Sequence, residues 1–116
     1  MNEFLLLFRG GDAKTARQSP EAWQIHMAKW GKWLGDLSEK GQMLGAQPLH
    51  ETGHVISEAN KVVTDGPYME GKEMVGGYLL CKAEDYVEAL EIAKGCPILD
   101  MPGGLVEVRE VQNLAM

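Results

Sequence analysis

The sequence has few features that would link it to a disulfide framework or a nucleic acid. Its 116 residues include two cysteines, Cys81 and Cys96, which lack the CxxC spacing of a metal or redox site. We expect both to be reduced structural thiols. The 11 Lys and Arg are outnumbered by 17 Asp and Glu, and the resulting net charge of −6 disfavours phosphate-rich partners. We therefore predict no direct nucleic-acid partner.

Long hydrophobic runs are also lacking. The apolar run at residues 4–8 is too short for a membrane span, and no positive charge precedes it as in a signal peptide. The sequence thus predicts a cytoplasmic protein without membrane association. At this length and 45% hydrophobic content, one core suffices, so we expect a single domain over residues 1–116.

The first half of the chain predicts a strand followed by a helix. The strand covers residues 4–9 and ends at a Gly-Gly turn. Ser19 and Pro20 give a side-chain cap and a first-turn proline, and Gly41 supplies a left-handed stop, so the helix runs over residues 20–40. Apolar residues spaced by four and three form one stripe on it: Trp23, Met27, Trp30, Leu34 and Leu37.

The second half predicts mainly strands. Residues 42–51 and 54–64 have short apolar runs, with Ala59-Asn60 as a hairpin tip. Residues 74–82 form a strand whose Gly76-Gly77 pair indicates a bulge or a close backbone approach. A helix then opens at residue 84 or 85 and ends at Gly95, and residues 105–111 alternate as a half-exposed strand. The expected inner face of that helix is Tyr86, Val87, Leu90 and Ala93.

This order, β-α-β-β-α-β with an extra hairpin before the third core strand, predicts an α+β fold of the ferredoxin-like type. Both helices then cover one face of the sheet. The strands at residues 4–8 and 75–80 are apolar on both sides, so the other face needs a cover. A second copy of the sheet provides one, and we expect a homodimer.

One segment resembles a known family signature. Residues 64–73 read TDGPYMEGKE, and GGY follows at residues 76–78. This pattern resembles the YCII-related proteins of the DGPF type, whose signature has DGPF, an acid, a KE pair and GGY; Tyr68 stands here in place of Phe. The similarity extends to Cys96-Pro97 and to the closing VEVRE.

The resemblance implies a ferredoxin-like fold that pairs sheet to sheet as a dimeric α+β barrel. Relatives of the DGPF type are associated with extracytoplasmic-function sigma factors. The broader family often carries a histidine in the first helix and an aspartate from the central segment, proposed as an acid–base pair. Here Trp30 occupies the matching helix position, and His26 lies one turn earlier.

The candidate site centres on Asp65. Asp65-Gly66-Pro67 is typical of a rigid turn, which needs no ligand, but charged and aromatic residues cluster around it as in binding loops. We hypothesise that Asp65 and His26 are catalytic, although a histidine beside an apolar stripe is more often a core residue. The expected ligand-binding residues are Tyr68, Glu70, Lys72, Tyr78 and Trp30.

The letters HETGH at residues 50–54 match a zinc-peptidase motif, but that chemistry needs a helix, and Pro48 and Gly53 bracket the segment. We predict no metal site. The glycine pairs lack the context of a dinucleotide or phosphate loop, so we predict no cofactor.

The sequence thus favours a small dimeric protein that binds a small metabolite in a cleft through the DGPY loop, with Asp-centred acid–base chemistry as one option. Whether it is an enzyme stays open. The alternative is a non-catalytic accessory to transcriptional regulation, associated with a sigma factor. A cleft with converging ionisable groups favours the first hypothesis, and an exposed apolar patch favours the second.

Overall fold

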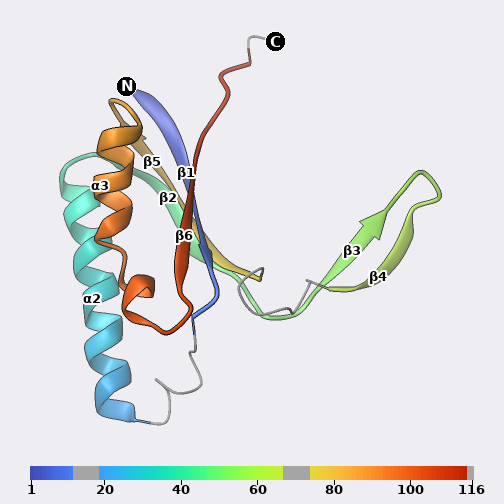
Figure 1. Cartoon of the computed structure of the whole chain (residues 1–116), viewed down its shortest axis with the longest axis horizontal. Helices are drawn as coiled ribbons and strands as arrows, with labels where there is room; N and C mark the ends of the chain where they lie inside the picture. Colours follow the sequence, from blue (N-terminus) through green and yellow to red (C-terminus); the bar gives the residue numbers. More distant parts are fainter. Residues whose placement is uncertain (12–18, 67–73, 115–116) are drawn as a thin grey trace.

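The computed structural model describes residues 1–11, 19–66 and 74–114. Its main layer is an antiparallel sheet in the order β2-β5-β1-β6, built from β1 (Asn2–Arg9), β2 (Met43–Pro48), β5 (Val75–Ala83) and β6 (Leu105–Glu110). The helices α2 (Pro20–Glu39) and α3 (Tyr86–Lys94) lie together on one side of it (Figure 1), and the short 3-10 helix η2 (Pro97–Asp100) leads from α3 towards β6. This arrangement confirms the predicted ferredoxin-like α+β fold.

The ends of α2 follow the predicted local chemistry. Ser19 Oγ accepts a hydrogen bond from the backbone N–H of Ala22, which satisfies one free donor of the first turn. Gly41 adopts a φ of 69°, and the N–H of Gln42 reaches back to the carbonyl of Leu37. This pattern closes the helix as a Schellman motif, because glycine reaches the left-handed conformation without a Cβ penalty.

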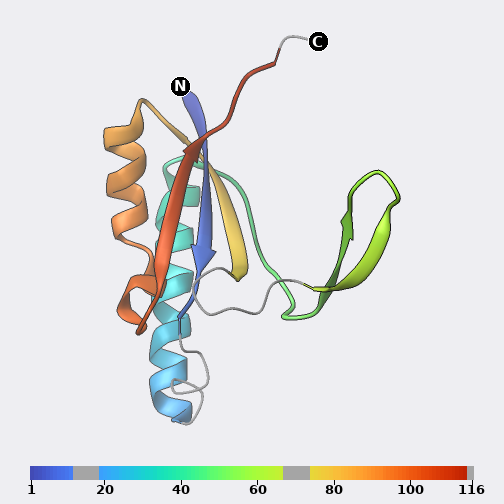
Figure 2. The same ribbon diagram turned by 45° about the vertical axis from the view of Figure 1, so that its right-hand side comes forward.

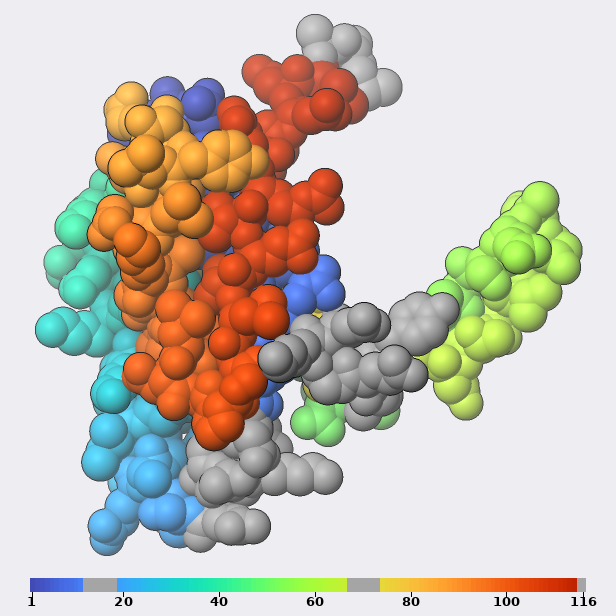
Figure 3. Space-filling view, in the orientation of Figure 1, coloured from blue at the N-terminus to red at the C-terminus, as the bar shows by residue number. Residues whose placement is uncertain are grey.

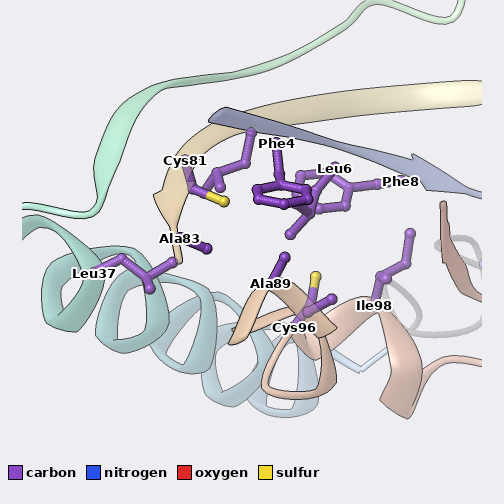
Figure 4. Close-up of a cluster of buried hydrophobic side chains, with 11 residues drawn as sticks. Phe4, Leu6, Phe8, Leu37, Cys81, Ala83, Ala89, Cys96 and Ile98 are labelled. Atoms are coloured by element: carbon purple, nitrogen blue, oxygen red, sulfur yellow. The ribbon is translucent and has the colours of Figure 1, made fainter. Parts of the chain in front are cut away.

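The core lies between the sheet and the two helices (Figure 4). Phe4, Leu6 and Phe8 alternate along β1 towards the helices, and the facing positions of β5 include Leu79 and Cys81. All five side chains are at most 6% exposed, so the alternation of β1 has the period of two expected for a strand with a packed face.

The expected inner face of α3 is wrong in two places. Val87 is 70% exposed and Leu90 is 46% exposed, whereas Ala89 and Ala93 are buried. The helix is capped by Asp85, and its inward stripe then falls on residues 86, 89 and 93. Small side chains at the closest positions let the helix approach the sheet, so apolar size did not identify the buried face.

The other side of the sheet, which we call the open face, carries Leu5, Leu7 and Leu80. These leucines are half-buried and alternate with the core residues along their strands. Both helices lie on the opposite side of the sheet (Figures 1 and 2). The apolar character of both strand faces, which the sequence indicated, is therefore present in the structure.

The predicted extra hairpin forms from β3 (Gly53–Ser57) and β4 (Val62–Gly66). Its turn covers residues 58–61 and includes the expected Ala59-Asn60 tip; Glu58 and Lys61 in this turn have φ values of 61° and 57°. The two strands make a sheet of their own, and they stand off the body of the molecule on the open-face side (Figures 1 and 2).

Candidate functional site

A pocket with a cavity volume of about 370 Å³ lies between α2 and the edge of the sheet formed by β2 and β5. Its size is within the range of small-molecule sites. Aromatic, aliphatic and glycine residues make up almost all of its lining: Phe8, Trp23, Met27, Trp30, Leu34, Ala46, Gln47, Pro48, Gly76, Gly77, Tyr78 and Ile98.

The helical wall of this pocket is the apolar stripe that the sequence predicted for α2. Its C-terminal member, Leu37, is buried in the core, but Trp23, Trp30 and Leu34 are half-buried and Met27 is 48% exposed. The Trp30 ring meets the Phe8 ring edge to face, with 5.2 Å between centroids. The stripe thus performs two tasks, because one end packs the core and the other lines the pocket.

The Gly76-Gly77 pair places β5 close to β2 at the strand side of the pocket. The register with β1 shifts here, since Phe8 pairs with Gly77 while Arg9 pairs with Val75. A Cβ on Gly77 would lie 3.0 Å from the carbonyl oxygen of Gln47 and 3.3 Å from Cα of Pro48. Both predicted reasons for glycine, a bulge and a close approach, therefore apply.

His26 is held against the aromatic wall. Its Nε2 accepts a hydrogen bond of 2.9 Å from the indole N–H of Trp30, one turn later on α2. The Trp23 ring lies on its other side, with 5.8 Å between ring centroids. Because an accepting nitrogen carries no proton, neutral His26 keeps its proton on Nδ1. His26 therefore contacts two pocket residues without being one itself.

Asp65 lies elsewhere. It is on β4 in the hairpin, opposite His54, and its Oδ1 is 3.6 Å from Nδ1 of that histidine. The Asp65 side chain is fully exposed. Within one chain the structure brings Trp30, Tyr78 and the neighbouring His26 together at the pocket, and it places Asp65 apart from them, on the hairpin that stands off the body (Figure 1).

Three predicted ligand-binding residues, Tyr68, Glu70 and Lys72, lie outside the described residues. The same applies to Pro67, so the expected turn is described only up to Gly66, where β4 ends. The position of the DGPY segment relative to the pocket therefore stays a prediction.

The HETGH segment has no helical geometry. Glu51 lies in a bend and His54 is already in β3, so the two histidines do not share a helix face. In the described residues, no group of three His, Cys, Asp or Glu side chains has a metal-binding arrangement.

The two cysteines are free and buried. Burial raises the pKa of Cys96 to about 12; the nearby Asp100 carboxylate acts in the same direction, and a backbone hydrogen bond from Ile98 acts against it. Burial also raises the pKa of Cys81, with a smaller contribution from Glu88. Both thiols are thus poor nucleophiles and serve as small apolar side chains of the core.

On the strand side of the pocket, the sequence predicted Tyr78 as a ligand-binding residue but not its neighbours in the lining. Phe8 was taken only as part of a buried strand, and Ala46 and Pro48 carry no chemical signal of their own. The available signal was the length of the apolar stripe on α2, whose N-terminal members, Trp23 and Met27, extend to the pocket lining.

Comparisons with known proteins support the fold. A family model described as YCII-related domain matches residues 4–115. No curated protein matches the sequence. Among solved structures, the chain is similar to 5-chloro-2-hydroxyhydroquinone dehydrochlorinase (TftG) from Burkholderia phenoliruptrix AC1100, with a TM-score of 0.50 and 17% identity, over 95% of this chain and 93% of that one. That structure is a complex with 2,5-dihydroxybenzoquinone.

No helix in the described part of the chain is both long enough and apolar enough to span a membrane.

Proposed function

The chain belongs to the YCII-related domain family, and on that basis we propose that its pocket between α2, β2 and β5 binds a small, flat ring compound. The observation that carries this proposal is the wall of Trp23, Trp30 and Phe8, because aromatic side chains pack well against the faces and edges of a planar ligand. The ring ligand of the structurally similar dehydrochlorinase supports the same class of compound.

The polar part of such a ligand meets few groups. Gln47 and Tyr78 belong to the lining, but they pair with each other and with Leu7, so their side chains lie on the open-face side of the strands. His26 stands behind Trp30. A largely apolar pocket with a few polar groups favours a planar ring with hydroxyl or carbonyl substituents at its rim, because the ring faces pack on the apolar wall while the substituents stay able to form hydrogen bonds.

The test is a binding comparison of two matched variants, with hydroquinone and 2,5-dihydroxybenzoquinone as probes and glucose as a non-planar control. Ala46→Leu fills the pocket, whereas Ala28→Leu makes the same change at an exposed position of α2 outside the lining. We expect calorimetric binding of a ring probe to wild type and to Ala28→Leu, and its loss in a folded Ala46→Leu. Equal binding to both variants would contradict the proposal.

We propose that the working form is a homodimer in which the open faces pack on each other. The apolar Leu5, Leu7 and Leu80 support this, since a sheet with an apolar uncovered face normally finds a partner layer. Sedimentation velocity at micromolar concentration tests it, and a monomer under those conditions would contradict it. The two free thiols agree with the reducing conditions of the cytoplasm, where we place the protein.

We further propose that Asp65 and His26 contribute to ligand binding or proton transfer, together with Tyr68, Glu70 and Lys72 of the loop. His26 is adjacent to the pocket wall, and in its neutral form Nδ1 carries the proton and can donate a hydrogen bond. Asp65 is exposed and makes one weak ion pair, so its charge is available to a ligand.

The alternative function, an accessory to a sigma factor, is favoured by one observation. Val87 and Leu90 are 70% and 46% exposed on α3, and such a patch suits a protein partner. Co-sedimentation with an extracytoplasmic-function sigma factor of the same genome tests this, and we expect Val87→Asp to abolish any complex that uses α3.

A further inference from the structure

The β3–β4 hairpin has an unusual amount of apolar surface for a segment that forms a sheet of its own, apart from the other described strands. Ile56 and Val63 pair across the two strands, on one face of the hairpin, and are 66% and 59% exposed. Val62 on the other face is 47% exposed. An isolated two-stranded hairpin is marginally stable in water, so this one needs a surface to pack against.

Within residues 1–11, 19–66 and 74–114, the sheet and the helices do not provide that surface. β3 and β4 form a separate sheet, and the space-filling view shows the hairpin standing clear of the sheet and helices (Figure 3). The Cα radius of gyration is 15.8 Å, whereas a compact chain of this length has roughly 13 Å. The larger radius of gyration reflects the projecting hairpin, which leaves a recess between itself and the open face.

A second copy of this chain fits the recess. The open face is apolar at Leu5, Leu7 and Leu80, and the edge strand β6 adds Glu107 and Arg109 beside them. The hairpin projects on the same side of the molecule (Figures 1 and 2). A partner sheet packed about 10 Å above the open face would therefore lie between that face and the hairpin. The arrangement is reciprocal in a twofold dimer, because each copy extends one hairpin and receives another.

The area that a stable dimer needs also supports a second copy as the occupant of the recess. Four strands about 4.8 Å apart, with about six residues at 3.3 Å each, give the open face a flat footprint of roughly 400 Å². Standard interfaces bury roughly 800 Å² of accessible surface per partner, and a flat footprint understates accessible area, so the sheet face supplies at least about half of that amount. Each copy also buries one face of its own hairpin and the surface that the partner's hairpin covers. At roughly 160 Å² each, these two contacts supply most of the remaining area.

We propose that the β3–β4 hairpin is a dimerisation arm whose exposed apolar side chains, Ile56 and Val63, pack against a second copy seated on the open face. The arm rests on the proposed homodimer, and it adds a specific surface that the sheet face does not contain. It does not depend on the ligand pocket.

The test compares dimer dissociation constants by sedimentation equilibrium. The double variant Ile56→Ser with Val63→Ser removes the apolar face of the arm, and Val87→Ser makes the same kind of change at a position that is 70% exposed on the helix side. We expect the double variant to dimerise at least about tenfold more weakly and Val87→Ser to match wild type. If wild type is a dimer and the double variant dimerises equally tightly, the arm proposal is wrong and the homodimer proposal stands. If wild type is a monomer, both proposals are wrong.

Hydrogen exchange on wild type provides a second measurement, which holds even if the double variant does not fold. We expect the hairpin amides that donate across the β3–β4 pairing to be protected in the dimer and to lose protection on dilution, while the amides of β1 stay protected. Rapid exchange of the hairpin amides in a sample that sediments as a dimer would overturn the proposal.

Discussion

The indole N–H of Trp30 donates a hydrogen bond of 2.9 Å to Nε2 of His26 and thereby links the imidazole to the pocket wall. The bond connects residues one turn apart, so it forms within the helix. It fixes the orientation of the imidazole ring before any ligand arrives, because Nε2 is engaged and Nδ1 keeps the proton.

Trp30→Phe is expected to release His26 while keeping an aromatic ring beside Phe8. The unfolding free energy should fall by about 1 kcal/mol, because one half-buried hydrogen bond is lost. Nitrogen NMR of the imidazole should show a single Nδ1–H tautomer in wild type and a mixture in the variant. Trp33→Phe is the control: it removes the bond from Trp33 to the carbonyl of Ile92 and should leave the tautomer unchanged.

Gly77→Ala is expected to destabilise the chain by about 1–3 kcal/mol, because the new Cβ would press on backbone atoms of β2 that cannot move independently. Gly76→Ala is the matched neighbour, since its Cβ would meet the carbonyl oxygen of Phe8 at 4.0 Å, an ordinary contact. Urea unfolding of both variants checks this. Equal losses at the two positions would contradict the assignment of the close approach to Gly77.

Local signals in the sequence predicted the local structure well. Gly41 and Ser19 predicted the ends of α2, and the Gly76-Gly77 pair predicted the irregular strand, because each depends on the conformation of a few residues. The ferredoxin-like order followed from these elements, since few topologies connect them without crossings.

Features that depend on contacts between residues far apart in the sequence were harder to predict. The inner face of α3 was misassigned because Ala89 and Ala93 are buried for their small size, which a search for large apolar residues overlooks. The placement of Asp65 depends on where the hairpin stands relative to the sheet, and no local pattern fixes that orientation. Trp30 and Tyr78 were found as pocket residues through the stripe and the family resemblance.

Cys96 should make stability fall at alkaline pH. Its pKa is raised by burial from 9.0 to about 12, so the unfolded chain loses the proton first. The contribution of the Cys96 thiol to the unfolding free energy is fully present below about pH 9. It is lost as the pH rises towards 12, at up to about 1.4 kcal/mol per pH unit. Urea unfolding of wild type and Cys96→Ala between pH 8 and pH 10 checks this. We expect the difference between the two proteins to shrink as the pH rises, and a constant difference would contradict the assignment.

Asp65→Asn is expected to leave the fold unchanged and to weaken the response to ring probes. The Asp65 carboxylate is fully exposed and its ion pair with His54 spans 3.6 Å, so the folded chain gains little from its charge. Asparagine keeps the size and one acceptor oxygen but removes the charge.

If the carboxylate binds a ligand or moves a proton, the melting temperature without probe should match wild type, while the shift produced by hydroquinone or 2,5-dihydroxybenzoquinone should become smaller. Glu58→Gln neutralises another acid of the same hairpin and should keep the full shift. An Asp65→Asn variant whose probe response equals that of wild type would exclude Asp65 from the site and leave the pocket to α2, β2 and β5 alone.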